Sequence, residues 1–210
     1  MPKMKWIGLT GGIATGKSTI ARLFESRDYP VIDADQISHD ITRFGEPGYL
    51  QVVSQFGPQI LQENQQINRT LLGEIVFKDL NKKNELESIL HPLIQKKVSQ
   101  MRHQFELDGE RYCIYDVPLL FEKKMQTISK ELQSKFDCII TAWCPPDLQL
   151  LRLMSRNKLS QDQAVTRIST QLALIDKIGE SHYCIDNSGS ESDLILLVNK
   201  MCDLMDLNQI

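Results

Sequence analysis

The chain has 210 residues, of which 41% are hydrophobic, and its 24 basic and 27 acidic side chains give a formal net charge of −3. A chain of this size can bury a sizeable core, so we expect one globular domain with room for an inserted subdomain. The near balance of charge supplies no overall field for nucleic acid or an anionic membrane, and neither is an expected partner.

The N-terminal segment and the cysteines predict a cytoplasmic protein. The segment MPKMKWIGL lacks the long apolar region of a signal peptide. No apolar stretch approaches the roughly 20 residues that a membrane span needs. The cysteines form no C-x-x-C pair, and we expect small core residues in a reducing compartment rather than disulfides or a zinc site. They are Cys113, Cys138, Cys144, Cys184 and Cys202.

Apolar runs alternate with helical patterns along the chain. Buried parallel strands are predicted, in chain order, at residues 5–10, 29–33, 112–118 and 136–144, with a shorter fifth strand at 182–186. Apolar stripes at helical spacing follow the first strand, at Ile20, Leu23 and Phe24, and the last strand, at residues 194–205. This alternation predicts an α/β fold, a parallel sheet of about five strands flanked by helices with right-handed crossovers.

A long interval, residues 36–110, separates the second and third predicted strands and exceeds an ordinary crossover. Apolar residues from Leu86 to Phe105 recur at i, i+3/i+4 spacing, with one interruption at Pro92, where we expect a new helix to start. The interval is therefore predicted to be a helical insertion. The expected organisation is a single domain over 5–206, with a core of 5–35 and 111–206 and the insertion at 36–110.

The sequence GGIATGKS follows the first predicted strand and fits the phosphate-binding pattern G-x-x-x-x-G-K-[ST]. Glycines let the backbone approach phosphate oxygens closely, and successive N–H groups add to the N-terminus of the next helix. The lysine reaches the β and γ phosphates, and the serine hydroxyl can ligate Mg²⁺. The alternative is a glycine-rich turn that binds nothing, but the strand before and the helix after favour phosphate binding. The motif therefore predicts a triphosphate site, with Ser18 as the metal ligand.

The remaining motifs favour a small-molecule kinase over other phosphate-loop proteins. A switch GTPase would carry Asn-Lys-x-Asp, but after Asn157 the aspartate position holds Ser160. Small-molecule kinases usually cover their phosphates with an arginine-bearing lid. Arg152, Arg156 and Arg167 lie in a candidate lid at about 152–172, and the alternative for each is a solvated helix face.

Acidic residues end two of the predicted strands, at the sheet edge where α/β folds bind ligands. Asp33 and Asp35 share one face if the strand continues, and the alternative is that Asp35 caps a helix that begins at Gln36. Asp116 is either a magnesium-supporting acid or a turn residue before a proline. His91 either faces a cleft of the insertion or is a buried, hydrogen-bonded histidine. Residues 186–189 form a turn whose position suggests a base pocket.

The motifs together resemble the dephospho-CoA kinase family across residues 7–189. Those that carry the resemblance are IGLTGGIATGKST, VIDAD, FGEPGYLQVVSQFG, NRTLLGEIVF, LHPLIQ, DVPLLFE and CIDNSG. The resemblance implies transfer of the γ-phosphoryl group of ATP, with Mg²⁺, to the 3′-hydroxyl of the ribose of dephospho-CoA, giving CoA and ADP. A kinase for another small metabolite and a nucleotide-dependent regulatory protein remain as alternatives.

The resemblance also implies roles for single residues. The residues that would bind ATP at the loop are Gly12, Ile13, Ala14, Thr15, Gly16, Lys17, Ser18 and Thr19. Asp35 would be the base at the acceptor hydroxyl, with Asp33 near metal or substrate and Lys17 and Arg156 acting on the transferred phosphoryl group. Arg152 would belong to the lid and Asn187 would lie by the adenine, both on the ATP side. The insertion would receive the substrate, and the candidate substrate contacts are Arg69, His91 and Asp116. Two departures stand out: Ala14 and Thr15 replace the family's frequent glycine and serine, and Asn157 replaces an acidic residue after the lid arginine.

Overall fold

The computed structural model describes residues 3–117, 120–121 and 135–210. The described chain divides into two compact units. The first unit comprises Met1–Ile32 and Phe105–Ile210, and the second comprises Asp33–Gln104.

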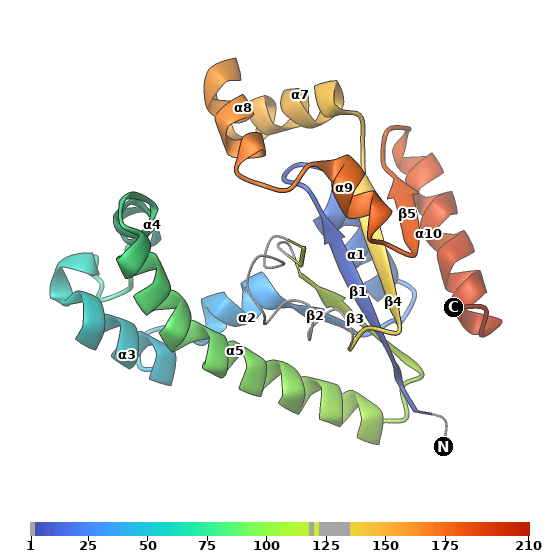
Figure 1. Cartoon of the computed structure of the whole chain (residues 1–210). Helices are drawn as coiled ribbons and strands as arrows, with labels where there is room; N and C mark the ends of the chain where they lie inside the picture. The colour runs from blue at the N-terminus through green and yellow to red at the C-terminus, as the bar shows by residue number, and fades with distance from the viewer. Residues whose placement is uncertain (1–2, 118–119, 122–134) are drawn as a thin grey trace. The chain divides into compact units, whose positions relative to one another are not determined.

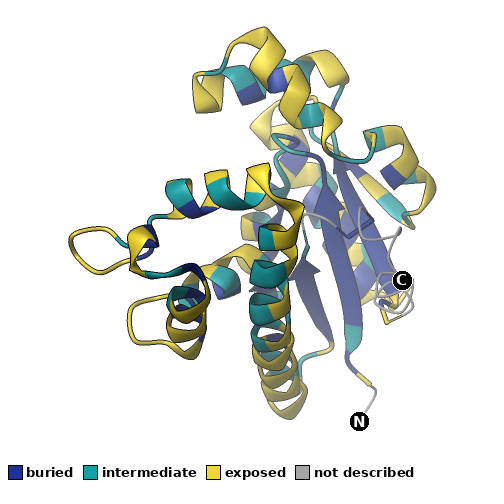
Figure 2. Cartoon of the chain, turned by 60° about the vertical axis from the view of Figure 1, so that its left-hand side comes forward, coloured by how far each residue is buried: buried dark blue, intermediate teal, exposed yellow. Residues whose placement is uncertain are grey.

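The first unit is built on a parallel sheet with the strand order β2-β3-β1-β4-β5 (Figure 1). Its strands are β1 (Lys5–Gly11), β2 (Val31–Asp33), β3 (Tyr112–Asp116), β4 (Cys138–Trp143) and β5 (Tyr183–Asp186). In the centre of the sheet, Ile7 of β1 lies opposite Ile114 of β3 and Cys138 of β4. The α/β fold and the strands predicted from the apolar runs are confirmed. The central runs are continuous rather than alternating because both faces of a parallel sheet are covered, and the central strands β3, β1 and β4 are accordingly almost entirely buried (Figure 2).

Helices cover the two faces of this sheet. α1 (Lys17–Glu25) and α10 (Glu191–Asp206) pack on one face, where Ile20, Phe24 and Val198 join a core that includes Ile140 of β4. The next residue, Thr141, points to the opposite face, where its hydroxyl hydrogen-bonds to Ser181 after α9 (Leu174–Gly179). The predicted helical stripes are therefore confirmed as core-facing.

The connection from β4 to β5 is helical. It comprises α7 (Pro146–Asn157), α8 (Gln161–Ser169) and α9, and α7 begins just beyond the carboxyl end of β4 (Figure 1). Lys158 ends α7 in the left-handed conformation, with φ of 52°. Ser160 and Gln163 then form a capping box that starts α8. The left-handed Lys158 and the capping box thus divide the predicted lid segment between two helices.

The second unit is helical. It contains α2 (Ala34–Asp40), α3 (Pro47–Phe56), the 3₁₀ turn η1 (Pro58–Ile60), α4 (Arg69–Lys78) and most of α5 (Leu80–Leu107). Tyr49, Val52, Phe56, Ile60 and Leu72 form a small core of its own. The helical character predicted for the long interval is confirmed.

The prediction that Pro92 starts a new helix is wrong, because Pro92 lies inside α5. A proline there removes one backbone hydrogen bond and crowds the carbonyl of Ser88. The apolar stripe nevertheless continues on both sides, and Leu86 and Leu90 pack on the core of the second unit while Val98 is buried further along. Packing of this stripe outweighs the local cost.

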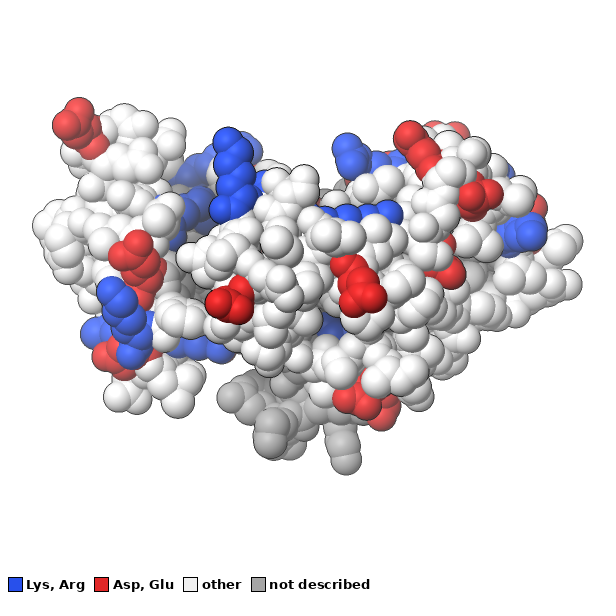
Figure 3. All heavy atoms as spheres, turned by 90° about the horizontal axis from the view of Figure 1, so that it is seen from above, with Lys and Arg blue, Asp and Glu red and all other residues white. Residues whose placement is uncertain are grey.

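The cysteines are free thiols, and four of them are buried. Burial raises the pKa of Cys138 to about 12 and that of Cys202 to about 11, so neither thiol is readily ionised. Cys184 corrects the prediction of a core position, because it is exposed on the edge strand β5. None of the described helices is long and apolar enough to cross a membrane. Figure 3 shows basic and acidic side chains interspersed on one face, as the small net charge suggests.

Candidate active site

The loop between β1 and α1 has the backbone that a phosphate site requires. Gly16 adopts φ of 88° and caps the N-terminus of α1, and the N–H groups of Thr19 and Ile20 donate to its carbonyl. A Cβ on Gly16 would lie 1.9 Å from Nδ2 of Asn187, so only glycine fits. Ala14 also has a positive φ, 61°, a conformation that glycine adopts at lower cost than alanine.

Side chains from far along the sequence hold the outside of this loop. Nε2 of Gln149 donates to the carbonyl of Ile13 at 2.8 Å, and Oε1 of Gln171 accepts from the N–H of Ile13 at 2.8 Å. Nδ2 of Asn187 donates to the carbonyl of Thr15 at 2.9 Å. The loop is thus fixed by the segment between β4 and α10 before any nucleotide binds.

Lys17, the lysine of the motif, forms an ion pair with Asp116. Asp116 ends β3 and lies opposite Leu9 of β1. The sheet register therefore places Asp116 beside the strand that leads into the loop of Lys17. The Asp116 side chain is buried, at 3% exposure, whereas Ser18 next to Lys17 is exposed. The structure therefore places Asp116 at the phosphate loop and not in a free turn.

Two of the predicted lid arginines, Arg152 and Arg156, lie on successive turns of α7. Nη1 of Arg152 donates to the carbonyl of Asn187 at 2.9 Å, so Asn187 connects the phosphate loop to α7. Arg156 is exposed, and its Nε donates to Oδ1 of Asn157 at 2.9 Å. The amide of Asn157 therefore pairs with this arginine where the family pattern has an acidic residue. Arg167 is exposed on α8.

The acidic pair of the second unit differs from the sequence prediction. β2 ends at Asp33 and α2 begins at Ala34, so Asp33 and Asp35 do not share a strand face. Asp33 is the N-cap, and its Oδ1 accepts from the N–H groups of Asp35 at 2.8 Å and Gln36 at 3.0 Å. The alternative in which Asp35 caps a helix starting at Gln36 is therefore wrong. Asp35 is an exposed residue of the first helical turn.

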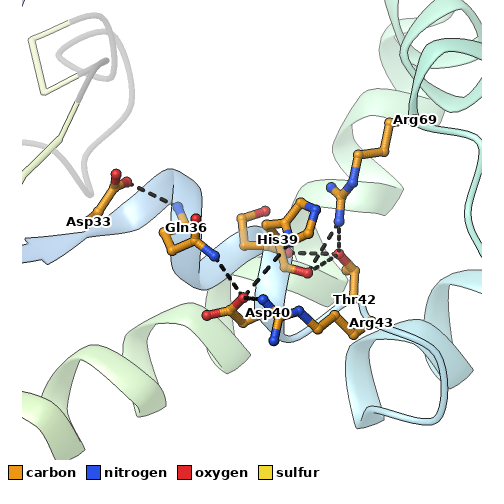
Figure 4. A network of polar contacts seen from close by, with 8 residues as sticks. Asp33, Gln36, His39, Asp40, Thr42, Arg43 and Arg69 are labelled. Atoms are coloured by element: carbon orange, nitrogen blue, oxygen red, sulfur yellow. Dashed lines mark hydrogen bonds and ion pairs between the residues drawn. The ribbon is translucent and has the colours of Figure 1, made fainter. Parts of the chain in front are cut away.

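Arg69 belongs to a polar network in the second unit (Figure 4). Its Nη2 donates to Oγ1 of Thr42 at 2.7 Å and to the carbonyl of His39 at 3.2 Å. Asp40 pairs instead with Arg43, at 2.8 Å, and no ion pair among the described residues involves Arg69. Partial burial lowers the pKa of Arg69, although a guanidinium stays protonated in proteins. Arg69 therefore presents a positive charge held by neutral oxygens. His91, the other predicted substrate contact, is half-buried on α5.

Comparison with known proteins shows which kind of phosphate-loop protein this is. Residues 5–193 match the family model for dephospho-CoA kinase. The chain belongs to the dephospho-CoA kinase family. Kinase activity, ATP as a substrate and phosphorylation of dephospho-CoA, all predicted from the sequence, are thereby confirmed.

Relatives of this kinase extend over nearly its whole length. The dephospho-CoA kinase of Bacillus licheniformis is 39% identical over 197 residues, covering 94% of each chain. That of Carboxydothermus hydrogenoformans is 42% identical over 184 residues, covering 88% of this chain and 86% of its own. The solved structure of the dephospho-CoA kinase from Campylobacter jejuni superposes with a TM-score of 0.71 at 27% identity, covering 99% of this chain and 100% of its own.

Sequence reasoning missed two side chains that hold the phosphate loop of this kinase. Gln149 is buried on α7 and Gln171 follows α8, and both bond to the backbone of Ile13. Gln149 stands between Leu148 and Leu150 on α7, and neither glutamine belongs to a local motif that would indicate such a long-range contact. Part of the DVPLLFE motif, residues 118, 119 and 122, lies outside the described residues.

Proposed function

We propose that the phosphate loop of this kinase holds the triphosphate of ATP and that the 3′-hydroxyl of the ribose of dephospho-CoA accepts the γ-phosphoryl group. The observation that carries the proposal is the loop itself. Its backbone is pre-shaped by Gly16 and by side chains from the second half of the chain, and Lys17 lies at the start of α1 beside Asp116. Such pre-organisation supplies the positioning on which phosphoryl transfer depends.

A panel of acceptors tests this proposal. ADP release by the purified protein is expected to depend on added dephospho-CoA, and the rate with nucleosides or shikimate in its place is expected to stay at the background of ATP alone. Equal rates with a nucleoside would favour a kinase for another metabolite. A slow rate that no acceptor changes would favour a regulatory nucleotide-binding protein.

Mg²⁺ fits the chemistry of the residues at the loop, and we assign Ser18 as its protein ligand. The Ser18 hydroxyl is exposed in the first turn of α1, and the Asp116 carboxylate at the loop is a second hard oxygen group. Mg²⁺ is usually held by one or two protein oxygen ligands together with substrate phosphates and water. When bound, Mg²⁺ neutralises phosphate charge.

The arginines of α7 are proposed to act on the phosphates, with Arg152 and Arg156 in different roles. Arg152 is engaged with the carbonyl of Asn187, which suits a residue that fixes the lid segment and the adenine side of the site. Arg156 is held only by the neutral amide of Asn157 among the described residues, so its charge is available for the transferred group. Charge stabilisation of that kind acts in the transition state.

We expect Arg156→Ala to lower kcat on the order of 10²–10³-fold, with a smaller effect on KM for ATP. Steady-state kinetics with saturating dephospho-CoA measure both constants. Arg27→Ala is the matched control, because Arg27 is an exposed arginine bonded to Asn199 of α10, and it should keep both constants. A raised KM with unchanged kcat would instead place Arg156 in ground-state binding, and no change would make it part of a solvated face.

The second unit is proposed to bind the acceptor. Asp35 is assigned as the base for the 3′-hydroxyl because its side chain is exposed in the first turn of α2, directly after the carboxyl end of β2. Arg69 carries a charge without a carboxylate partner among the described residues, which suits the diphosphate of dephospho-CoA, and His91 is a further candidate contact. The reduced, mostly buried cysteines agree with the cytoplasmic location that we propose.

A further inference from the structure

Lys177 is a buried lysine that has no part in the proposed function. It lies on α9 with 0% exposure, and its Nζ donates to the carbonyl of Gly11 at 3.3 Å. Asp116 and Lys177 are the charged residues that are buried within the described part of the chain. Both contact the phosphate-loop region, Asp116 through Lys17 and Lys177 through the residue where β1 becomes the loop. A charge is costly to bury, so its position calls for an explanation.

The fold holds Lys177 firmly in place. The hydroxyl of Ser181 donates to the carbonyl of Lys177 at 2.7 Å, and the same hydroxyl bonds to Thr141 of β4. At the N-terminal end of α9, Leu174 packs against Gly12, where an added Cβ would lie 3.0 Å from the leucine side chain. α9 is thus pinned both to the sheet and to the loop, which keeps the backbone of Lys177 close to the Gly11 carbonyl.

The carbonyl of Gly11 lies where β1 ends and the phosphate loop begins. A carbonyl oxygen that turned toward the phosphates would repel them, whereas N–H groups that face them attract them. By binding the Gly11 carbonyl, Lys177 fixes the peptide that leads into Gly12 and keeps its oxygen on the side of α9. Its own positive charge, in a site removed from water, also adds to the potential felt by an anion in the loop.

We propose that Lys177 is a positioning residue of the phosphate site. It strengthens the binding of the nucleotide's phosphates by orienting the Gly11 carbonyl and by its positive charge. The inference rests on the proposed role of the phosphate loop. The inference predicts that the affinity for the phosphate groups depends on Lys177, whereas the affinity for the nucleoside part does not. A lysine that only filled space would affect both alike.

The test compares the binding of ADP and of adenosine by isothermal titration calorimetry for the wild type, Lys177→Met and Lys177→Gln. Methionine keeps the length and the apolar stem but removes the charge and the donor, and glutamine keeps a donor without the charge. Lys177→Met is expected to weaken ADP binding on the order of 10- to 100-fold and to leave adenosine binding within about twofold. Lys177→Gln should lie between it and the wild type. Lys200→Gln, an exposed lysine on α10, is the matched control and should bind both ligands normally.

The outcomes separate this inference from the proposed function. If the wild type itself fails to bind ADP more tightly than adenosine, the phosphate-loop assignment fails. If the wild type discriminates and Lys177→Met weakens both ligands by the same factor, or neither, Lys177 is structural and the inference is overturned. If Lys177→Met does not fold, Lys177→Gln decides, because wild-type ADP affinity in that variant would show that the charge is not needed.

Discussion

Lys17→Ala is expected to lower kcat by at least the order of 10²–10³-fold and to lower stability as well. The loss of activity follows because the lysine supplies the charge that meets the β and γ phosphates. The loss of stability follows from the ion pair with Asp116, whose side chain is only 3% exposed. Removing one partner of a buried pair costs about 3–5 kcal/mol.

A double variant separates the two effects of this substitution. Lys17→Ala with Asp116→Asn removes both charges, so most of the lost stability should return, while phosphoryl transfer should stay low. Thermal unfolding and the ADP-release assay on the two variants measure this directly. Near-normal turnover in Lys17→Ala would contradict the assignment of the phosphate site, and no recovery of stability in the double variant would contradict the account of the ion pair.

Asp35→Asn is expected to lower kcat on the order of 10²–10⁴-fold with almost no change in thermal stability. Asparagine cannot take a proton from a ribose hydroxyl near neutral pH. A loose transition state makes modest demands on a base, which favours the lower part of the range. Stability should be preserved because the cap of α2 is Asp33, not Asp35.

Asp33 provides the control for this prediction. Asp33→Asn keeps the cap, since the two residue types cap helices about equally well, whereas Asp33→Ala should cost about 1 kcal/mol. Comparison of kcat and the unfolding midpoint across the three variants separates the base from the cap. Full activity in Asp35→Asn would mean that the acceptor hydroxyl is activated elsewhere, with Asp33 or Asp116 as the next candidate.

The parts of the fold that local sequence determines were predictable. Each strand is a continuous apolar run, and the stripe with Ile20 and Phe24 follows helical periodicity. The phosphate loop was predictable because its residues are contiguous and each has a local physical reason. The family resemblance rested on motifs spread over the chain, and it therefore predicted the acceptor substrate as well as the nucleotide.

The rest depends on contacts between distant residues or on a competition between nearby ones. Asp33 and Asp35 are both acceptable caps, and the point at which β2 ends decides between them. Pro92 remains inside α5 because the packing of the stripe outweighs a local rule. Gln149 and Lys177 meet the phosphate loop across more than 130 positions, as the sequence separations of 136 and 166 show, and no local pattern reports such contacts.

Identification of the product is the most direct test of the central claim, that this kinase phosphorylates the ribose 3′-hydroxyl of dephospho-CoA. The purified protein is incubated with ATP, Mg²⁺ and dephospho-CoA, and the product is followed by mass spectrometry and ³¹P nuclear magnetic resonance. We expect one phosphoryl group to be added to dephospho-CoA for each ADP formed, with a new phosphomonoester resonance that matches the 3′-phosphate of authentic CoA. ADP formed without a phosphorylated product, or a phosphate on another hydroxyl, would contradict the account.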